Sequence, residues 1–172
     1  MRQPNIEQNA AGAAFWRFAL ALYARPGVAE ALIALQDRAG RDVNLILFGL
    51  WLGAARGHAL DTAELARAEA AVAPIRLAIV EPLRRQRRRL QGIDDPDLQA
   101  LRRRIVGLEI AAERRAQYRL AAAVVPPAQV EPAGDRLVTA EDNLALYLGA
   151  EAHSAEADML RHALRSLVRR SC

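Results

Sequence analysis

Two groups of polar residues in this 172-residue sequence have types and spacing suited to a small-ligand site. Gln36, Asp42 and Asn44 lie around a short turn between two apolar stretches, and Asn44 precedes Trp51 by two helical turns. An amide beside an aromatic side chain is a suitable wall for a pocket that binds a small molecule. The structural alternative is that Asp42 caps the following helix and Asn44 holds the turn.

The second group is Glu109, Glu113 and Gln117, which are spaced by four and share one helix face. Like charges at this spacing repel by about 0.2–0.5 kcal/mol, so a compensating cation is expected. Arginines from neighbouring helices are the expected cation, and a metal ion is the alternative. No metal ligand, catalytic residue or cofactor is assigned, because the sequence has no Glu-x-x-His pair and no recognisable catalytic spacing. The candidate pocket comprises Gln36, Asp42, Asn44, Trp51, Glu109, Glu113 and Gln117.

Basic residues form the most conspicuous run. All 24 basic residues are arginine, and residues 84–119 contain 11 of them against five acidic residues. A helical hairpin around Gly92 would bring two clusters to the same end and could bind nucleic acid or another polyanion. This reading is not favoured, because no aromatic residue lies between Trp51 and Tyr118 to stack on bases, and arginine runs are commonly solvated. The candidate polyanion-binding residues are Arg84, Arg85, Arg87, Arg88, Arg89, Arg102, Arg103 and Arg104.

The elements that must position these residues are predicted to be helices. Apolar residues make up 52% of the chain and aromatic residues 5%, and alanine, leucine and arginine, which favour helices, are frequent. Capping and proline signals place helices at about 11–24, 28–39, 43–56, 61–73, 74–91, 96–124, 139–148 and 154–169. Pro82 is expected to kink or split the fifth helix.

Apolar spacing predicts one apolar face on each of two of these helices. The inner stripe of the fifth helix is expected to contain Ile75, Ile79, Leu83 and Leu90. One face of the longest helix carries Leu98, Leu101, Ile105, Leu108 and Ala112.

The fold class is therefore all-α, a single-domain bundle of about seven to eight helices with a candidate C-terminal helical appendage. Residues 1–10 are expected to be a flexible N-terminus, 11–125 the main bundle, 126–138 a proline-bearing loop, and 139–172 C-terminal helices that pack on the bundle. A cytoplasmic protein without a membrane span is expected. The only cysteine is Cys172, and the longest apolar run, residues 45–55, is short for a bilayer.

A combination of motifs in the first 51 residues carries a family likeness. The motifs are Phe15-Trp16-x-Phe18, Leu35-Gln36-x-x-x-Gly40-x-Asp42-Val43-Asn44, and Trp51. The chain resembles a proteobacterial family of small conserved hypothetical proteins that are uncharacterised and helical, over about residues 15–120. The resemblance implies a helical fold and brings no activity and no site residues.

The favoured function is a non-enzymatic protein-interaction or regulatory module. The predicted helices at 11–24 and 43–56 are apolar nearly all round, and a chain of this size buries two such helices with difficulty. The surplus apolar face predicts a homodimer or a protein partner. The alternatives are polyanion binding through the hairpin and a small-ligand binder or enzyme that uses the candidate pocket.

Overall fold

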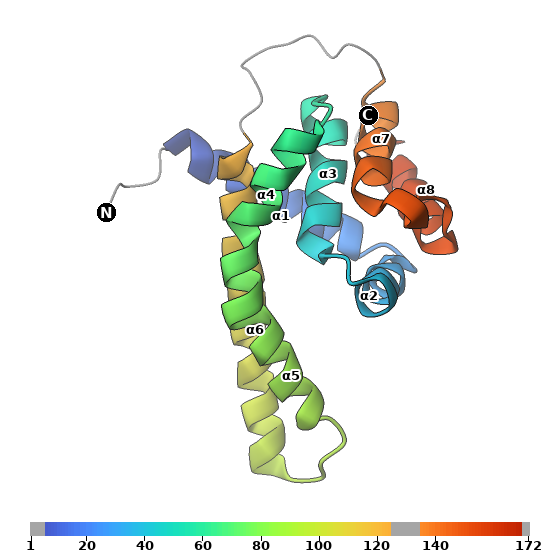
Figure 1. Ribbon diagram of the computed structural model, residues 1–172. Helices are drawn as coiled ribbons and strands as arrows, with labels where there is room; N and C mark the ends of the chain where they lie inside the picture. Colours follow the sequence, from blue (N-terminus) through green and yellow to red (C-terminus); the bar gives the residue numbers. More distant parts are fainter. Residues whose placement is uncertain (1–5, 125–134, 170–172) are drawn as a thin grey trace.

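The computed structural model describes residues 6–124 and 135–169, and these form an all-α bundle without a strand in either range (Figure 1). This confirms the predicted fold class of seven to eight helices. The elements are α1 (Ile6–Tyr23), α2 (Val28–Ala39), α3 (Val43–Arg56), α4 (Thr62–Ile75), the π-helical turn η1 (Arg76–Val80), α5 (Glu81–Arg89), α6 (Pro96–Ala123), α7 (Arg136–Leu148), the 3₁₀ turn η2 (Gly149–His153) and α8 (Ala155–Arg169).

Local capping signals place most helix ends correctly. Asp42 caps α3, and Asp61 forms a capping box with Glu64 at the start of α4. Gly40 follows α2 with φ of 65°, the left-handed conformation that glycine adopts without strain. Asp95 caps α6 ahead of a proline at its first position. These ends depend on neighbouring residues, so sequence alone predicts them.

The first helix and the first C-terminal helix both begin earlier than the predicted segment bounds. Helix α1 begins at Ile6 rather than near residue 11, and the rest of the expected flexible N-terminus lies outside the described residues. Helix α7 begins at Arg136 rather than Thr139, because the carboxylate of Asp135 accepts a hydrogen bond from the amide of Leu137 and caps the helix earlier. Most of the expected loop at 126–138 also lies outside the described residues.

The path from α4 to α5 corrects the expectation that Pro74 begins a new helix. Pro74 lies inside α4, which continues through η1 into α5 without a loop. In η1 the amide of Glu81 donates to the carbonyl of Arg76, five residues back. The π-helical spacing lies directly before Pro82, which has no amide hydrogen to donate, so the turn takes the place of the predicted split.

The π turn also changes which side chains face inward. Val80 is 2% exposed and Ile79 is 46% exposed, so the predicted position of Ile79 in the inner stripe is wrong. A π turn contains one residue more than an α turn and rotates the following residues about the helix axis. The apolar spacing in the sequence assumes an uninterrupted α-helix and therefore misplaces Ile79.

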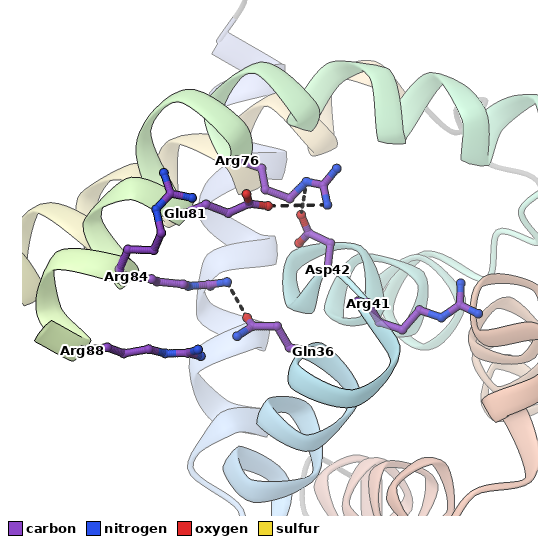
Figure 2. Close-up of a pocket in the computed structure, with 9 residues that line it drawn as sticks. Gln36, Arg41, Asp42, Arg76, Glu81, Arg84 and Arg88 are labelled. Atoms are coloured by element: carbon purple, nitrogen blue, oxygen red, sulfur yellow. Dashed lines mark hydrogen bonds and ion pairs between the residues drawn. The ribbon is translucent and has the colours of Figure 1, made fainter.

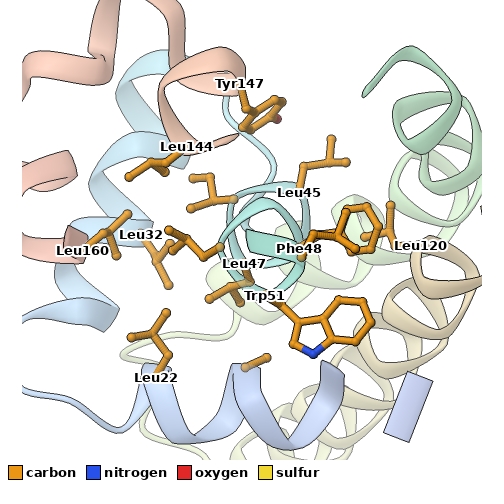
Figure 3. Close-up of a cluster of buried hydrophobic side chains, with 14 of the residues drawn as sticks. Leu22, Leu32, Leu45, Leu47, Phe48, Trp51, Leu120, Leu144, Tyr147 and Leu160 are labelled. Atoms are coloured by element: carbon orange, nitrogen blue, oxygen red, sulfur yellow. The ribbon is translucent and has the colours of Figure 1, made fainter. Parts of the chain in front are cut away.

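Helix α3 lies at the centre of the bundle, and core side chains surround it (Figure 3). All ten residues from Asn44 to Gly53 are buried. Helix α7 packs along α3 so closely that a Cβ atom added to Gly53 would lie 2.3 Å from the Cα atom of Ala140. The C-terminal part of the chain therefore covers the apolar helix that the sequence suggested would need a partner.

Helix α5 and residues 90–113 form a two-helix arm that extends away from the rest of the bundle (Figure 1). Helix α5 buries none of its residues fully. The apolar stripe of α6 is only partly covered in the arm, since Leu101 is 45% exposed and Leu108 is 59% exposed. The buried face of α6 lies beside this stripe and includes Glu109 and Gln117.

No single helix in the described ranges has both the length and the apolar character to cross a membrane. Only α1 and α2 taken together, which are bent by 102° at their junction, pass such a test by length and composition.

Candidate functional site

The turn between α2 and α3 is held by Asp42, which is buried. Its Oδ1 atom accepts a hydrogen bond from the amide of Asn44 at 2.8 Å, and its own amide donates to the hydroxyl of Tyr147 at 2.8 Å. The expected capping role of Asp42 is confirmed. The contact with Tyr147 also fastens this turn to α7.

The side chain of Asn44 points to α6 rather than into open space. Its Oδ1 atom accepts a hydrogen bond from Nε2 of Gln117 at 3.0 Å, and both residues are buried. The Oε1 atom of Gln117 is buried without a hydrogen-bond partner among the described residues. The pair therefore joins α3 to α6 inside the bundle.

Trp51 is separate from the polar residues with which the sequence grouped it. Its ring stacks on Phe15 with centroids 5.2 Å apart. The ring of Phe48 lies 6.0 Å from that of Trp51, and both belong to the buried cluster (Figure 3). Trp51 lines neither of the two cavities described below. Its role in the described structure is to fill the core.

Arg84 lies at the centre of the remaining polar residues. Its guanidinium pairs with Glu113, donates from Nε to Oε1 of Glu109 at 3.1 Å, and donates to the side-chain oxygen of Gln36 (Figure 2). Arg87 adds a second donor to Glu109 at 2.8 Å. The expectation that arginines compensate the two glutamates is confirmed. One network therefore contains residues of the candidate pocket and residues of the candidate polyanion-binding set.

Burial changes the ionisation of the acids in this region. Desolvation raises the pKa of Glu113 above its ordinary value, and the nearby charge of Arg84 opposes this shift. Desolvation likewise raises the pKa of Asp42, against the hydrogen bond from the amide of Asn44 and the charge of Arg76. The arginines therefore favour the charged form of both carboxylates, of which Asp42 is buried and Glu113 is partly buried.

The eight candidate polyanion-binding arginines do not form one unpaired surface. Arg84 and Arg87 are engaged by the glutamates of α6, and Arg88 pairs with Asp37 at 2.8 Å. Arg102 is partly buried, and its Nε atom has no hydrogen-bond partner in the described ranges. Four of the eight are exposed and have no carboxylate partner within the described part of the chain: Arg85, Arg89, Arg103 and Arg104.

A half-open cavity of about 250 Å³ lies between α5 and the turn from α2 to α3 (Figure 2). Five of its lining residues are arginines and two are acidic. The residues around it are Gln36, Gly40, Arg41, Asp42, Arg76, Glu81, Arg84, Arg85 and Arg88. Of the predicted pocket set, only Gln36 and Asp42 line this space.

Sequence reasoning missed Arg41, Arg76, Glu81 and Tyr147 as neighbours of Asp42. Arg76 approaches Asp42 with Nε and Oδ2 3.6 Å apart, and Arg41 lies over the ring of Tyr147 at 5.6 Å. The side chain of Arg76 approaches the carboxylate of Asp42, and the hydroxyl of Tyr147 accepts from the backbone amide of Asp42, so residues far apart in the sequence meet at the start of α3. No local motif marks them, although the adjacency of Arg41 to the capping aspartate was a usable signal.

Metal ligands do not gather in the described part of the chain, where no three His, Cys, Asp or Glu side chains are placed to hold a metal ion. The site is instead an arginine-rich cavity beside a buried ion-pair network.

The fold and site together define an all-α protein with an arginine–carboxylate network at the base of a helical arm. Residues 14–120 match the model of a family described as "Protein of unknown function (DUF2390)", and the chain belongs to this family. The match covers most of α1 and all of α2 to α5, and it ends within α6, while α7 and α8 lie beyond it. The predicted resemblance to an uncharacterised family is thus confirmed over nearly the expected span. Neither the curated proteins nor the solved structures contain a match to this chain.

Proposed function

We propose that this chain is a non-enzymatic protein-interaction module that pairs with a second copy of itself through the arm. The observation that carries the proposal is the apolar stripe of α6, whose residues Leu101 and Leu108 are left about half exposed. Exposed apolar residues that repeat along one helix face are typical of a surface that a partner covers.

The stripe has the spacing of a coiled-coil seam. Its five residues alternate three and four positions apart, which is the heptad pattern that packs one helix against another. They are Leu98, Leu101, Ile105, Leu108 and Ala112. Helix α5 contacts a neighbouring face of α6, where Glu109 is buried. Leu98, Ile105 and Ala112 are partly buried, and Leu101 and Leu108 are the seam residues left exposed.

Charge favours a second copy in the antiparallel direction as the partner. The tip of the arm carries Asp94, Asp95 and Asp97, whereas Arg104, one helical turn before Leu108, is exposed further from the tip. Two arms side by side in opposite directions place acidic tips beside arginines, and two arms in the same direction place like charges together. A two-fold axis makes both contacts equivalent.

Light scattering across a concentration series tests the pairing with a double variant, Leu101→Glu with Leu108→Glu. We expect a dimer for the wild type and a monomer for this variant, because burying two carboxylates in an apolar seam is strongly unfavourable. The matched control is Ile110→Glu, which replaces an exposed apolar residue on the opposite side of α6, and it should stay dimeric. A monomeric wild type, or a double variant that still pairs, would contradict the proposal.

The polyanion hypothesis remains a prediction and rests on Arg85, Arg89, Arg103 and Arg104. We expect a labelled random-sequence nucleic acid to bind the wild type more weakly as salt rises, if these residues form a working surface. Substituting all four by alanine should then abolish binding, whereas Arg87→Ala should change it less. Absence of binding at low salt would leave these arginines as a solvated face.

A further inference from the structure

The cavity between α5 and the turn from α2 to α3 adjoins a second cavity of about 440 Å³. Both are lined by Gly40, Arg41, Asp42 and Arg76, so they meet at the Asp42–Arg76 pair. The second cavity runs along α4, which contributes four apolar residues and one acidic residue, Glu69, to its lining. Its apolar lining residues include Leu45, Val72, Ala66, Ala70 and Ala73.

The arginines around the first cavity differ in how fully their donors are used. Arg84 is committed to two glutamates and Gln36, and Arg41 donates to the carbonyl of Leu148 at 2.7 Å and to Glu151 at 2.6 Å. Arg84 is therefore fixed by protein partners. Arg41 is held through one terminal nitrogen, and its Nε atom, like that of Arg76, is buried without a hydrogen-bond partner among the described residues.

Arg76 has the most unused donor capacity at the junction of the two cavities. Its closest acidic oxygens are those of Asp42 at 3.6 Å and Glu81 at 3.9 Å, both longer than a hydrogen bond. Its Nε atom is buried and has no hydrogen-bond partner among the described residues. A buried donor without an acceptor is costly, so an acceptor is expected at this position.

Two further arginines, both on α5, line the first cavity together with Arg76. Arg88 is exposed and has one partner, Asp37, and Arg85 has no carboxylate partner in the described part of the chain. Asp42 opposes an incoming anion, but one of its oxygens is used to cap α3. Glu81 and Glu69 are the other acidic residues that line the two cavities, and the loose contact of Glu81 with Arg76 is the one that an anion would replace.

We propose that the two cavities form one site for a small amphipathic anion. Its carboxylate, phosphate or sulfonate group binds Arg76, with Arg85 and Arg88 at the rim, and its apolar body lies along the alanines of α4. Charge and shape both contribute, because a bare inorganic anion leaves the apolar part empty and a neutral apolar compound leaves Arg76 without an acceptor. This site is separate from the proposed pairing surface on α6.

Isothermal titration calorimetry with 2-naphthalenesulfonate tests this site, with sodium sulfate and neutral 2-naphthalenemethanol as comparison probes. We expect the sulfonate to bind the wild-type chain more tightly than either comparison probe. Arg76→Gln should weaken this binding by about tenfold, the usual effect of losing one hydrogen bond to a charged group. The matched control is Arg67→Gln on the same helix, which pairs with Glu64 away from both cavities and should bind as the wild type does.

A second variant, Ala70→Trp, tests the apolar part without changing charge. Ala70 is exposed and lines the second cavity, so a larger side chain should exclude the naphthalene ring while the chain stays folded. Loss of binding in both Ala70→Trp and Arg76→Gln supports the proposal. Absence of binding to the wild type, equal binding of the neutral probe, or unchanged binding in either variant would overturn it.

Discussion

Helix α3 and the arm contain similar apolar side chains, but their surroundings differ. Helix α3 is covered on several sides by α1, α6 and α7, and ten consecutive residues are buried. The arm consists of two helices that cover each other along one face, and α5 has no fully buried residue. Two helices alone bury little apolar surface, so we expect the ion pairs at the base of the arm to contribute measurably to its position.

The largest difference between α3 and the arm should appear when a large apolar side chain in each is replaced by alanine. Leu50→Ala in α3 removes a side chain with no exposure and should lower the free energy of unfolding by about 2–5 kcal/mol. Ile110→Ala in the arm, where 48% of the residue is exposed, should cost less than about 0.5–1 kcal/mol. Urea denaturation measures both, and similar losses would show that the arm is packed as tightly as the core.

The close approach of α3 and α7 gives the next effect. Gly53→Ala places a methyl group where the backbone of Ala140 already lies, and overpacking of this kind should cost about 1–3 kcal/mol. Gly49→Ala one turn earlier is the control, because its added Cβ would lie 3.5 Å from Asn143, an ordinary contact. Thermal denaturation should show a loss only at Gly53. Equal melting temperatures for the two variants would mean that α7 can move away from α3.

The ion pairs at the base of the arm should matter less than a core side chain but more than an exposed one. Arg84→Met removes the main partner of Glu109 and Glu113 and should cost about 1–3 kcal/mol, because partly buried acceptors lose their donors. Arg85→Met, at an exposed position, should change the unfolding free energy little. Chemical denaturation near neutral pH measures both variants. Equal stability would indicate that packing alone holds the arm.

The last effect is confined to high pH and does not change stability near neutral pH. Burial raises the pKa of Tyr147 from 10.0 to about 12, so the folded state favours the neutral phenol. The stability that this group contributes is fully present below pH 10 and is lost as the pH rises towards about 12. Tyrosinate absorbance should show a late component that Tyr147→Phe removes. If the Tyr147 hydroxyl titrates near its ordinary pKa in the folded protein, its hydrogen bond with the amide of Asp42 is not formed in solution.

The parts of the fold that sequence predicted are those that neighbouring residues determine. The caps at Asp42, Asp61 and Asp95 depend on side chains within a few positions of the amides they bind. The inward position of Val80 was missed, because a π turn changes the helical period from which inward-facing residues are predicted.

The candidate site was predicted in its components but not in its assembly. The pairing of acidic Glu113 with an arginine followed from the unfavourable spacing of like charges, and the structure identifies that arginine as Arg84. The grouping of Trp51 with the polar residues failed, because residues on one helix face can enter either a polar site or the core. The contacts of Arg76 and Tyr147 with Asp42 join residues far apart in the chain, and spacing carries no information on them.

The π turn at residues 76–80 has a consequence for how this protein tolerates change in its gene. An α-helix rotates by about 100° for each residue, so the loss of one codon in this segment would restore the ordinary period and turn all of α5 by about that angle. Arg84 would then face away from Glu109 and Glu113, although every amino acid that pairs in the network would still be encoded. Substitutions in this segment are therefore expected to be tolerated far better than any change in its length.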